Sequence, residues 1–125
     1  MITTVSPYSV EETVERLRGS LERRSIKVFA TIDHAAGARE VGLELPDETV
    51  VVFGDPRAGT PLMQKDPAVG IELPLRVLVW DEGGTTKVSY EDPTALADGY
   101  RLDELQGRLE RMRALLDELA AEAAS

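Results

Sequence analysis

The stretch from Val50 to Trp80 constrains the fold more than any other part of the sequence. It contains two strongly apolar runs, Val50–Phe53 and Leu75–Trp80, separated by a segment rich in glycine, proline and aspartate. Short apolar runs bounded by turn-forming residues are typical of buried β-strands. The sequence therefore predicts two core strands. The segment between them is longer than most connections inside a domain, which is typical of a loop with a functional role.

The two apolar runs differ in what they predict about their surroundings. Val50–Phe53 is apolar on both faces of the predicted strand, which indicates a central strand covered on both sides. The second run is followed by Asp81-Glu82-Gly83-Gly84 and then by an alternating segment, Thr85–Tyr90. Glycine pairs accept the positive φ angles of tight hairpin turns, so residues 75–90 are predicted to form a β-hairpin.

Amphipathic helices are predicted near both ends of the chain. Ser9 and Glu12 have the spacing of a capping box, and apolar residues then recur every three or four positions, which predicts a helix over residues 10–24. From Leu102 to Ala123 the apolar residues follow an a/d heptad pattern, and Leu115 widens the stripe. This long helix has three open roles: packing on the sheet, pairing with a second subunit, or forming a projecting coiled coil. The wide stripe favours packing on the domain and the dimer together.

The region between the first helix and Val50 predicts one strand and one short helix. Alternation over Ile26–Ile32 places its even-numbered residues on one strand face. Asp33 is then well placed to cap a helix that Gly42 ends. With a short first strand at Ile2–Val5, the order of elements predicts a single α+β domain whose sheet is mostly antiparallel.

Net charge and residue types exclude several functions. The formal charge is −9, with 14 basic residues against 23 acidic ones. Because nucleic acids and anionic membranes are bound through clustered Lys and Arg, neither partner is expected. The absence of cysteine excludes disulfides and thiolate chemistry. The first residues lack the pattern of a signal peptide, and no apolar run approaches the ~20 residues of a membrane span, so a cytoplasmic location is expected.

Asp33 and His34 are the sharpest catalytic candidates. His34 is the only histidine, so any imidazole base from this chain must be this residue. A carboxylate beside an imidazole at a strand-to-helix junction can hold a polar ligand group or move a proton. The alternative is structural: Asp33 caps the helix, and His34 is hydrogen-bonded in its first turn. A soft-metal pair of His34 and Met63 has little support, and no metal site or cofactor is expected.

The segment after the first core strand is the candidate ligand-binding site. Its glycines, and a helical turn predicted to start at Thr60-Pro61, can present backbone N–H groups to a ligand. The spacing matches neither a Walker A loop nor a dinucleotide fingerprint, and the alternative is a turn-dense connection. The candidate residues in this segment are Phe53, Gly54, Asp55, Gly59, Thr60 and Met63.

Arg76 and Trp80 complete the set of candidate ligand-binding residues. They share one face of the predicted strand, with Leu78 between them. If that face lines a cavity, Arg76 meets an acidic ligand group and Trp80 stacks on a ring. The alternative is that Arg76 pairs with a surface carboxylate while Trp80 packs beneath a helix or a subunit.

Five motifs in order along the chain resemble those of the DUF302 family. They are Thr31–Ala36, Val52–Pro56, Gly59–Met63, Leu73–Trp80 and Ser89–Pro93. The resemblance covers about residues 5–102 and implies a TBP-like fold, a curved antiparallel sheet with helices on one face, and a homodimer. The family carries no established catalytic residues, so the resemblance assigns none. Asp55 departs from the pattern, which more often has asparagine, and an ionised aspartate cannot donate a hydrogen bond.

Together these features predict a DUF302-like α+β domain at residues 1–102, with a heptad helix at residues 103–125 packed on the same domain or dimer. The expected function is that of a homodimeric small-ligand-binding or accessory protein, with an unidentified small molecule as its ligand. One alternative is an enzyme in which His34 and Asp33 transfer a proton and the 54–63 loop binds substrate. The other is a purely structural assembly module that works through the C-terminal helix.

Overall fold

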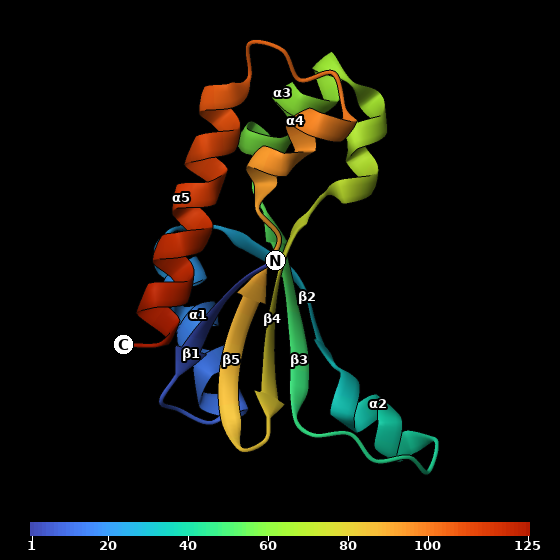
Figure 1. Cartoon of the computed structure of the whole chain (residues 1–125), viewed down its shortest axis with the longest axis vertical. Coiled ribbons are helices and arrows are strands. Elements are labelled where there is room, and N and C mark those ends of the chain that lie inside the picture. The colour runs from blue at the N-terminus through green and yellow to red at the C-terminus, as the bar shows by residue number, and fades with distance from the viewer.

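Five antiparallel strands form one sheet, in the order β1-β5-β4-β3-β2, in the computed structural model, which describes residues 1–125 (Figure 1). The strands are β1 (Ile2–Ser6), β2 (Lys27–Asp33), β3 (Glu48–Gly54), β4 (Leu75–Glu82) and β5 (Thr85–Tyr90). Because β1 and β2 are the outer strands, the hairpin of β4 and β5 lies inside the sheet. The predicted α+β class and antiparallel sheet are confirmed.

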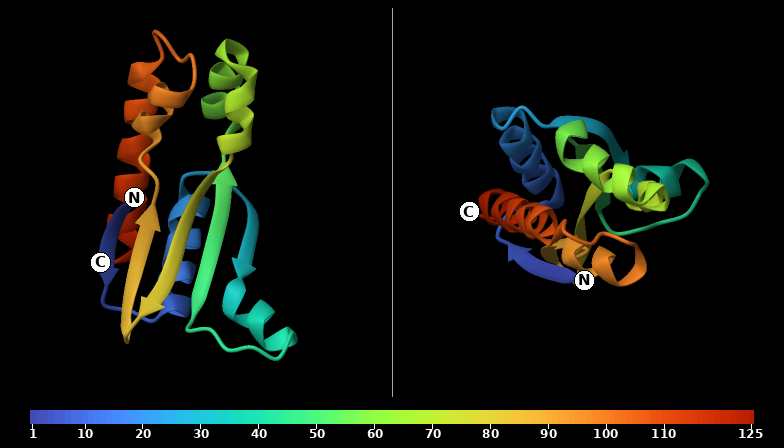
Figure 2. Two further views of the ribbon diagram at one scale, coloured as in Figure 1. Left: turned by 45° about the vertical axis from the view of Figure 1, so that its right-hand side comes forward. Right: turned by 90° about the horizontal axis from the view of Figure 1, so that it is seen from above.

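Most of the helices fall into two groups (Figure 2). The helices are α1 (Val10–Arg23), α2 (His34–Glu40), α3 (Pro56–Lys65), the 3-10 helices η1 (Pro67–Glu72) and η2 (Pro93–Ala95), α4 (Leu96–Gly99) and α5 (Gln106–Ala123). Helix α1 and the second half of α5 lie against the sheet, whereas α3, η1, α4 and the first half of α5 form a lobe beyond one end of it. No helix combines the length and apolar character needed to cross a bilayer.

One face of the sheet is covered by α1 and α5. The apolar stripes of the two helices meet the sheet in a single core. Its buried members are Val10, Val14, Leu17, Leu21, Val51, Phe53, Val77, Val79, Val88, Tyr90, Leu116, Leu119, Ala120 and Ala123. The heptad residues of α5 are thus buried within the same chain, which leaves that helix no free apolar stripe for a coiled coil.

The C-terminal helix begins at Gln106, later than the heptad pattern predicted. Leu102 and Leu105 precede it, because Glu104 has a φ of +72°, outside the right-handed helical region. Leu102 is nevertheless buried in the lobe, beside Leu109. The heptad pattern therefore identified buried residues correctly but misplaced the start of the helix.

A second apolar cluster holds the lobe together. Its buried members are Leu62, Val69, Leu102, Leu109 and Met112. Leu75, the first residue of β4, packs against this cluster and also against the sheet core. The two clusters therefore meet near Leu75, at the end of the sheet where the lobe begins.

The other face of the sheet is open. Val50 and Val52 of β3 are half-buried there, with Leu78 and Trp80 of β4 beside them. The prediction that Val50–Phe53 is covered on both sides is therefore wrong within one chain. The reason is that α1 and α5 both lie on the same side of the sheet, so no element of the chain remains to cover the second side.

A β-bulge at Phe29 overturns the predicted alternation of β2. Val28 pairs with Phe53 on the core side, but the register shifts after it and Ala30 pairs with Val52 on the open side. A bulge inserts one extra residue into a strand and so reverses the faces of the residues that follow. The even-numbered residues of this strand are therefore divided between two faces, and Phe29 is left 48% exposed.

Candidate functional site

Helix α3 contains most of the predicted ligand-binding segment and is capped by Asp55. The Asp55 carboxylate accepts the backbone N–H of Arg57 at 2.9 Å, and Pro56 occupies the first helical position. The predicted start at Thr60-Pro61 is therefore wrong, because Pro61 lies inside the helix. Asp55-Pro56 and Thr60-Pro61 both have the composition of a helix start. Asp55 also places a negative charge at the positive end of the helix dipole.

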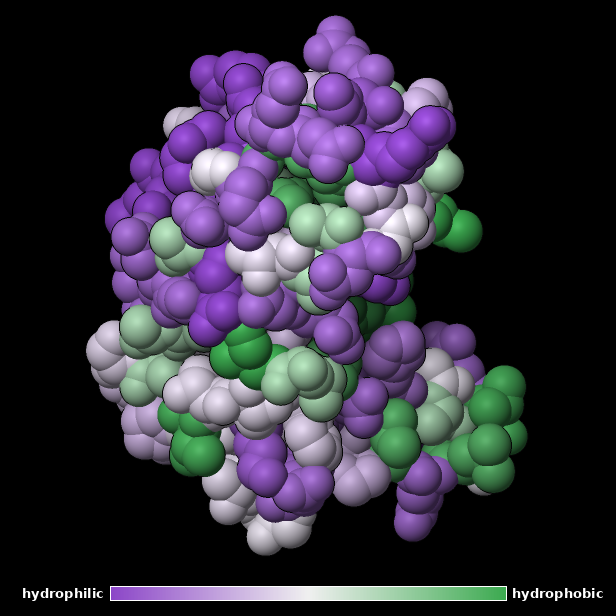
Figure 3. Space-filling view, turned by 45° about the horizontal axis from the view of Figure 1, so that its top comes forward, coloured by the Kyte–Doolittle hydropathy of each residue, from purple (hydrophilic) through white to green (hydrophobic).

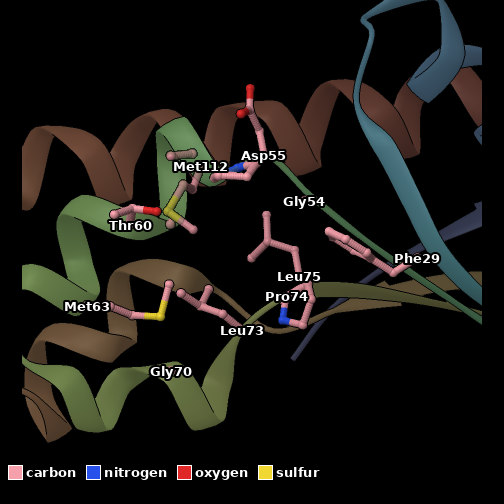
Figure 4. A pocket seen from close by; sticks show the side chains of 13 residues that line it. Phe29, Gly54, Asp55, Thr60, Met63, Gly70, Leu73, Pro74, Leu75 and Met112 are labelled. Atoms are coloured by element: carbon pink, nitrogen blue, oxygen red, sulfur yellow. The ribbon is translucent and has the colours of Figure 1, made fainter.

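A cavity of about 250 Å³ lies where the sheet core and the lobe meet (Figure 4). It is lined by Phe29, Gly54, Asp55, Pro56, Ala58, Gly59, Thr60, Met63, Gly70, Leu73, Pro74, Leu75 and Met112. Five of the residues predicted to bind a ligand line it, namely Gly54, Asp55, Gly59, Thr60 and Met63. The structure thus gathers most of the 54–63 candidates around one cavity.

The cavity walls are mostly apolar, and Asp55 is their only charged residue. The Asp55 carboxylate accepts the Nε–H of Arg57 at 3.1 Å and forms an ion pair with its Nη2 at 2.9 Å. The hydrogen bonds from the side chain and then the backbone of Arg57 hold the pKa of Asp55 below its ordinary value. The one carboxylate at the cavity is therefore ionised and already paired.

Three other candidate residues lie away from the cavity. Phe53 is fully buried in the sheet core. Trp80 lies half-buried on the open face of the sheet, where its Nε1–H donates to Oγ of Ser89 at 2.9 Å. Arg76 is exposed on that face and forms no ion pair, and it lines a groove of about 630 Å³ there together with His34.

Asp33 and His34 lie at the far end of the sheet from the cavity. Asp33 pairs with Thr49 in the β2–β3 ladder, whereas Gly54 pairs with Lys27 at the other end. At about 3.3 Å per residue, these two ends are roughly 20 Å apart. Within one chain the proposed acid–base pair and the 54–63 segment therefore do not converge. Neither do His34 and Met63, the soft-metal pair.

The geometry around Asp33 fits the structural alternative for that residue. Its carboxylate caps α2 by accepting the N–H of Ala36 at 2.9 Å. His34 is exposed, and its ring makes no hydrogen bond within the chain. No group of three or more His, Asp or Glu side chains has the arrangement of a metal site.

Several cavity residues were not among the sequence candidates. Phe29 reaches the cavity because of the β-bulge, and its ring lies 3.6 Å from the position that a Cβ on Gly54 would occupy. Gly70, Leu73 and Pro74 follow α3 in the chain, and Met112 comes from α5. The Leu73-Pro74 motif was visible as part of the family pattern, but nothing local indicated Phe29 or Met112.

A polar network outside the cavity joins β5 to α5. The hydroxyl of Tyr90 donates to Oδ1 of Asp117 at 2.6 Å, and Arg113 bridges Asp117 and Asp92. Burial, followed by the bond to Asp117, raises the pKa of Tyr90 to about 12. This network fixes the second half of α5 against the sheet, and the sequence pattern did not predict it.

Known proteins resemble this chain in sequence and in fold. Over residues 2–122 the sequence matches the family described as "Domain of unknown function DUF302". The match includes most of α5, which the five motifs alone left outside the family pattern. The fold is similar to the "Crystal structure of uncharacterized conserved protein DUF302 from Bacillus stearothermophilus", with a TM-score of 0.86 and 23% identity over 98% of this chain and 96% of that chain. At that identity the likeness shows the fold alone.

Curated relatives share sequence with most of this chain but are much longer. The chain is 40% identical over 103 residues to proteins named "Fluoride-specific ion channel FluC 1" in Brucella suis biovar 1 and Brucella abortus biovar 1. It is equally similar to "Fluoride-specific ion channel FluC 2" of Brucella melitensis biotype 1. These matches cover 82% of this chain but only 38–41% of the relatives, so the chain spans about two-fifths of their length.

Proposed function

The chain belongs to the DUF302 family, and from that premise we propose that it is a homodimeric small-ligand-binding or accessory domain. The cavity beside α3 is the ligand site in this proposal, and the open face of the sheet is the dimer interface. The cytoplasmic location expected from the sequence is part of the same proposal.

The observation that carries the ligand half is the convergence of the 54–63 segment on one cavity. Gly54, Asp55, Gly59, Thr60 and Met63 line it together, although they are spread over the end of a strand and the length of α3. A concave, mostly apolar pocket with a few polar groups is the usual form of a small-molecule site.

The dimer half is supported by the open face of the sheet. Its centre is apolar and half-buried, with Val50, Val52 and Leu78 side by side. A second copy whose strands run antiparallel to the first places Arg76, at one end of this face, opposite Glu48 at the other. Such an interface is self-complementary in charge, as a two-fold dimer requires.

A thermal-shift screen tests the ligand half. The purified chain is heated with a mixed set of neutral, cationic and anionic metabolites and with divalent metals. A ligand that binds only the folded state raises the melting temperature, and the rise grows with the logarithm of its concentration relative to its dissociation constant. We expect at least one chemical class to raise it, and a uniformly flat response contradicts ligand binding.

Light scattering of the Leu78→Glu variant tests the dimer half. We expect the wild-type chain to have twice the mass of one chain at micromolar concentration and Leu78→Glu to have the mass of one chain, because a carboxylate is not tolerated in an apolar interface. The control is Ala114→Glu, which adds the same charge at an exposed position of α5, on the helix-covered side. A wild-type monomer, or a Leu78→Glu dimer, contradicts the proposed interface.

A second candidate function is that of a fluoride-responsive accessory domain. It is favoured by the 40% identity to a region of proteins named as fluoride channels. The melting temperature of the chain in sodium fluoride is compared with that in sodium chloride at equal ionic strength. A rise specific to fluoride is expected from this candidate, and equal melting temperatures contradict it.

A further inference from the structure

We infer that the ligand of the cavity beside α3 is a neutral, mainly apolar molecule that is larger than benzene and smaller than a typical drug. The inference rests on the proposed ligand-binding function of this cavity and narrows its chemistry. It follows from the volume of the cavity, the character of its walls and the way in which the chain keeps the space empty.

The volume sets the size of the ligand. A closed apolar cavity of about 150 Å³ holds benzene, and drug-sized ligands occupy pockets of about 300–1,000 Å³. The cavity of about 250 Å³ lies between these limits. A molecule of two fused rings, or a branched aliphatic chain of similar bulk, matches it.

The walls set the charge of the ligand. Phe29, Leu73 and Met112 supply apolar surface, and the carboxylate of Asp55 is already paired with Arg57. A charged ligand loses its hydration in such a site without gaining a free partner of opposite charge. The hydroxyl of Thr60 remains as a hydrogen-bond acceptor, so a single N–H or O–H group on the ligand can be satisfied.

Three glycines keep the space empty. A Cβ at Gly54 would lie 3.4 Å from Pro74, a Cβ at Gly59 would lie 3.4 Å from Leu73 and 3.9 Å from the Met63 methyl group, and a Cβ at Gly70 would lie 3.3 Å from the sulfur of Met63. Each of these neighbours lines the cavity. Side chains at the three positions would therefore press against the cavity walls or occupy part of the cavity.

The backbone does not require glycine at these positions. Among the glycines, only Gly42, Gly83 and Gly84 have positive φ, where glycine avoids strain. Gly59 lies inside α3, and glycine in a helix is less stable than alanine by about 1 kcal/mol. The stability of α3 therefore favours alanine over glycine at position 59. Glycine at this position instead preserves the space of the cavity.

The two methionines let the walls adapt to a ligand. The chain has three methionines, and two of them, Met63 and Met112, line this cavity. Methionine is flexible and polarisable, so it fits irregular apolar and aromatic ligands. Met63 is 37% exposed and so has room to move, whereas Met112 is 6% exposed.

Calorimetric titration with three matched compounds tests the inference. Indole is neutral, indole-3-acetate is anionic and tryptamine is cationic at neutral pH, and all three carry the same ring. We expect indole to bind with a dissociation constant on the order of 1 mM or tighter, as its size allows. The charged analogues should bind at least about tenfold more weakly, because they lose hydration in an apolar site.

Glycine variants assign the binding to the cavity. Gly59→Leu fills the space and should weaken indole binding at least about tenfold, because the ring loses its apolar contacts. Gly59→Ala, a milder change that keeps the helix intact, should weaken binding by a smaller factor. The control is Gly37→Leu in α2, where nothing lies within 4 Å of an added Cβ, and it should bind indole as the wild type does.

The possible results separate the inference from the function on which it rests. Stronger binding of indole-3-acetate or tryptamine, lost in Gly59→Leu, overturns the neutral class but leaves the cavity as a ligand site. Indole binding that is unchanged in both Gly59 variants, or absent in the wild type, overturns the inference. Only a flat response in the broad thermal-shift screen overturns ligand binding itself.

Discussion

Gly59 of α3 faces Leu73 across the cavity wall, and a Cβ on Gly59 would lie 3.4 Å from Cδ1 of Leu73. That distance is an ordinary van der Waals contact, so one methyl group fits at Gly59 but a longer side chain must enter the cavity. The residue at position 59 therefore affects both the stability of α3 and the volume of the cavity.

Alanine at Gly59 should stabilise the chain while it narrows the cavity. We expect Gly59→Ala to raise the free energy of unfolding by about 0.5–1 kcal/mol, because alanine loses less backbone entropy than glycine in a helix. Gly37→Ala is the control in an exposed helix and should give a similar gain. Urea unfolding measures both variants. A loss of stability confined to Gly59→Ala would mean that the wall has no room for a methyl group.

Tyr90 should make the fold sensitive to alkaline pH. Its pKa is raised to about 12 by burial and by the bond to Asp117. The folded state favours the neutral phenol, so this contribution to stability is complete below the ordinary value of 10.0 and is lost as the pH rises toward 12. Absorbance titration at 295 nm should show one of the three tyrosines ionising near pH 12.

The Tyr90→Phe variant separates this effect from other alkaline changes. It should lose the late ionisation step and about 1 kcal/mol of stability at neutral pH, because the hydrogen bond to Asp117 is removed. In this variant the Asp117 carboxylate keeps its ion pair with Arg113, so the substitution does not leave an unpaired charge. An unchanged titration curve would show that the late step belongs to another tyrosine.

The ionised Asp66 carboxylate should stabilise the lobe at neutral pH but not in strong acid. Its carboxylate accepts the N–H of Arg101 at 2.9 Å and that of Ala68 at 3.2 Å, which ties the segment before α5 to η1. The bond from Arg101 is the main cause that lowers the pKa of Asp66 below its ordinary 3.8. Its contribution is therefore present above pH 3.8 and is lost as the pH falls through the lower, folded-state value.

Unfolding followed from pH 7 to pH 2 tests the role of Asp66. Asp66→Asn should be less stable than the wild type at pH 7, and the difference should shrink toward pH 2. The control is Asp98→Asn, because Asp98 is exposed and makes no hydrogen bond. Equal effects of the two substitutions would contradict a special role for Asp66.

Local chemistry made several elements predictable from the sequence. Asp33 caps α2 as predicted, and Gly42 ends that helix with a φ of +77°. The hairpin turn at Gly83 and Gly84 has the positive φ angles expected of it. Each of these predictions depends on a few neighbouring residues, so the single sequence was sufficient.

Tertiary effects limited the other predictions. The alternation in β2 could not reveal the bulge at Phe29, because a bulge is set by pairing with β3. The apolar character of Val50 and Val52 indicated a covered face, but the sequence could not show that both core helices lie on the other side. In the same way, Thr60-Pro61 indicated a helix start, whereas α3 begins at Pro56 with Asp55 as its cap.

The candidate site was predictable in part. The 54–63 segment was found because it is one continuous stretch, rich in turn-forming residues, in a long connection between two predicted core strands. Phe29 and Met112 were missed, since they reach the cavity from distant parts of the chain. The alternative in which His34 meets this segment requires residues at opposite ends of β3. His34 follows the end of β2 that pairs with the start of β3, whereas the segment begins where β3 ends.

The most direct test of ligand binding in the cavity is an NMR titration of the methionine methyl groups with indole. Met63 and Met112 line the cavity, whereas Met1 is 73% exposed and lines the groove on the open face instead, so it serves as the internal control. We predict that the signals of Met63 and Met112 shift together and saturate with one dissociation constant, while the Met1 signal stays in place. Unmoved Met63 and Met112 signals, or equal unsaturated shifts of all three, would contradict the account.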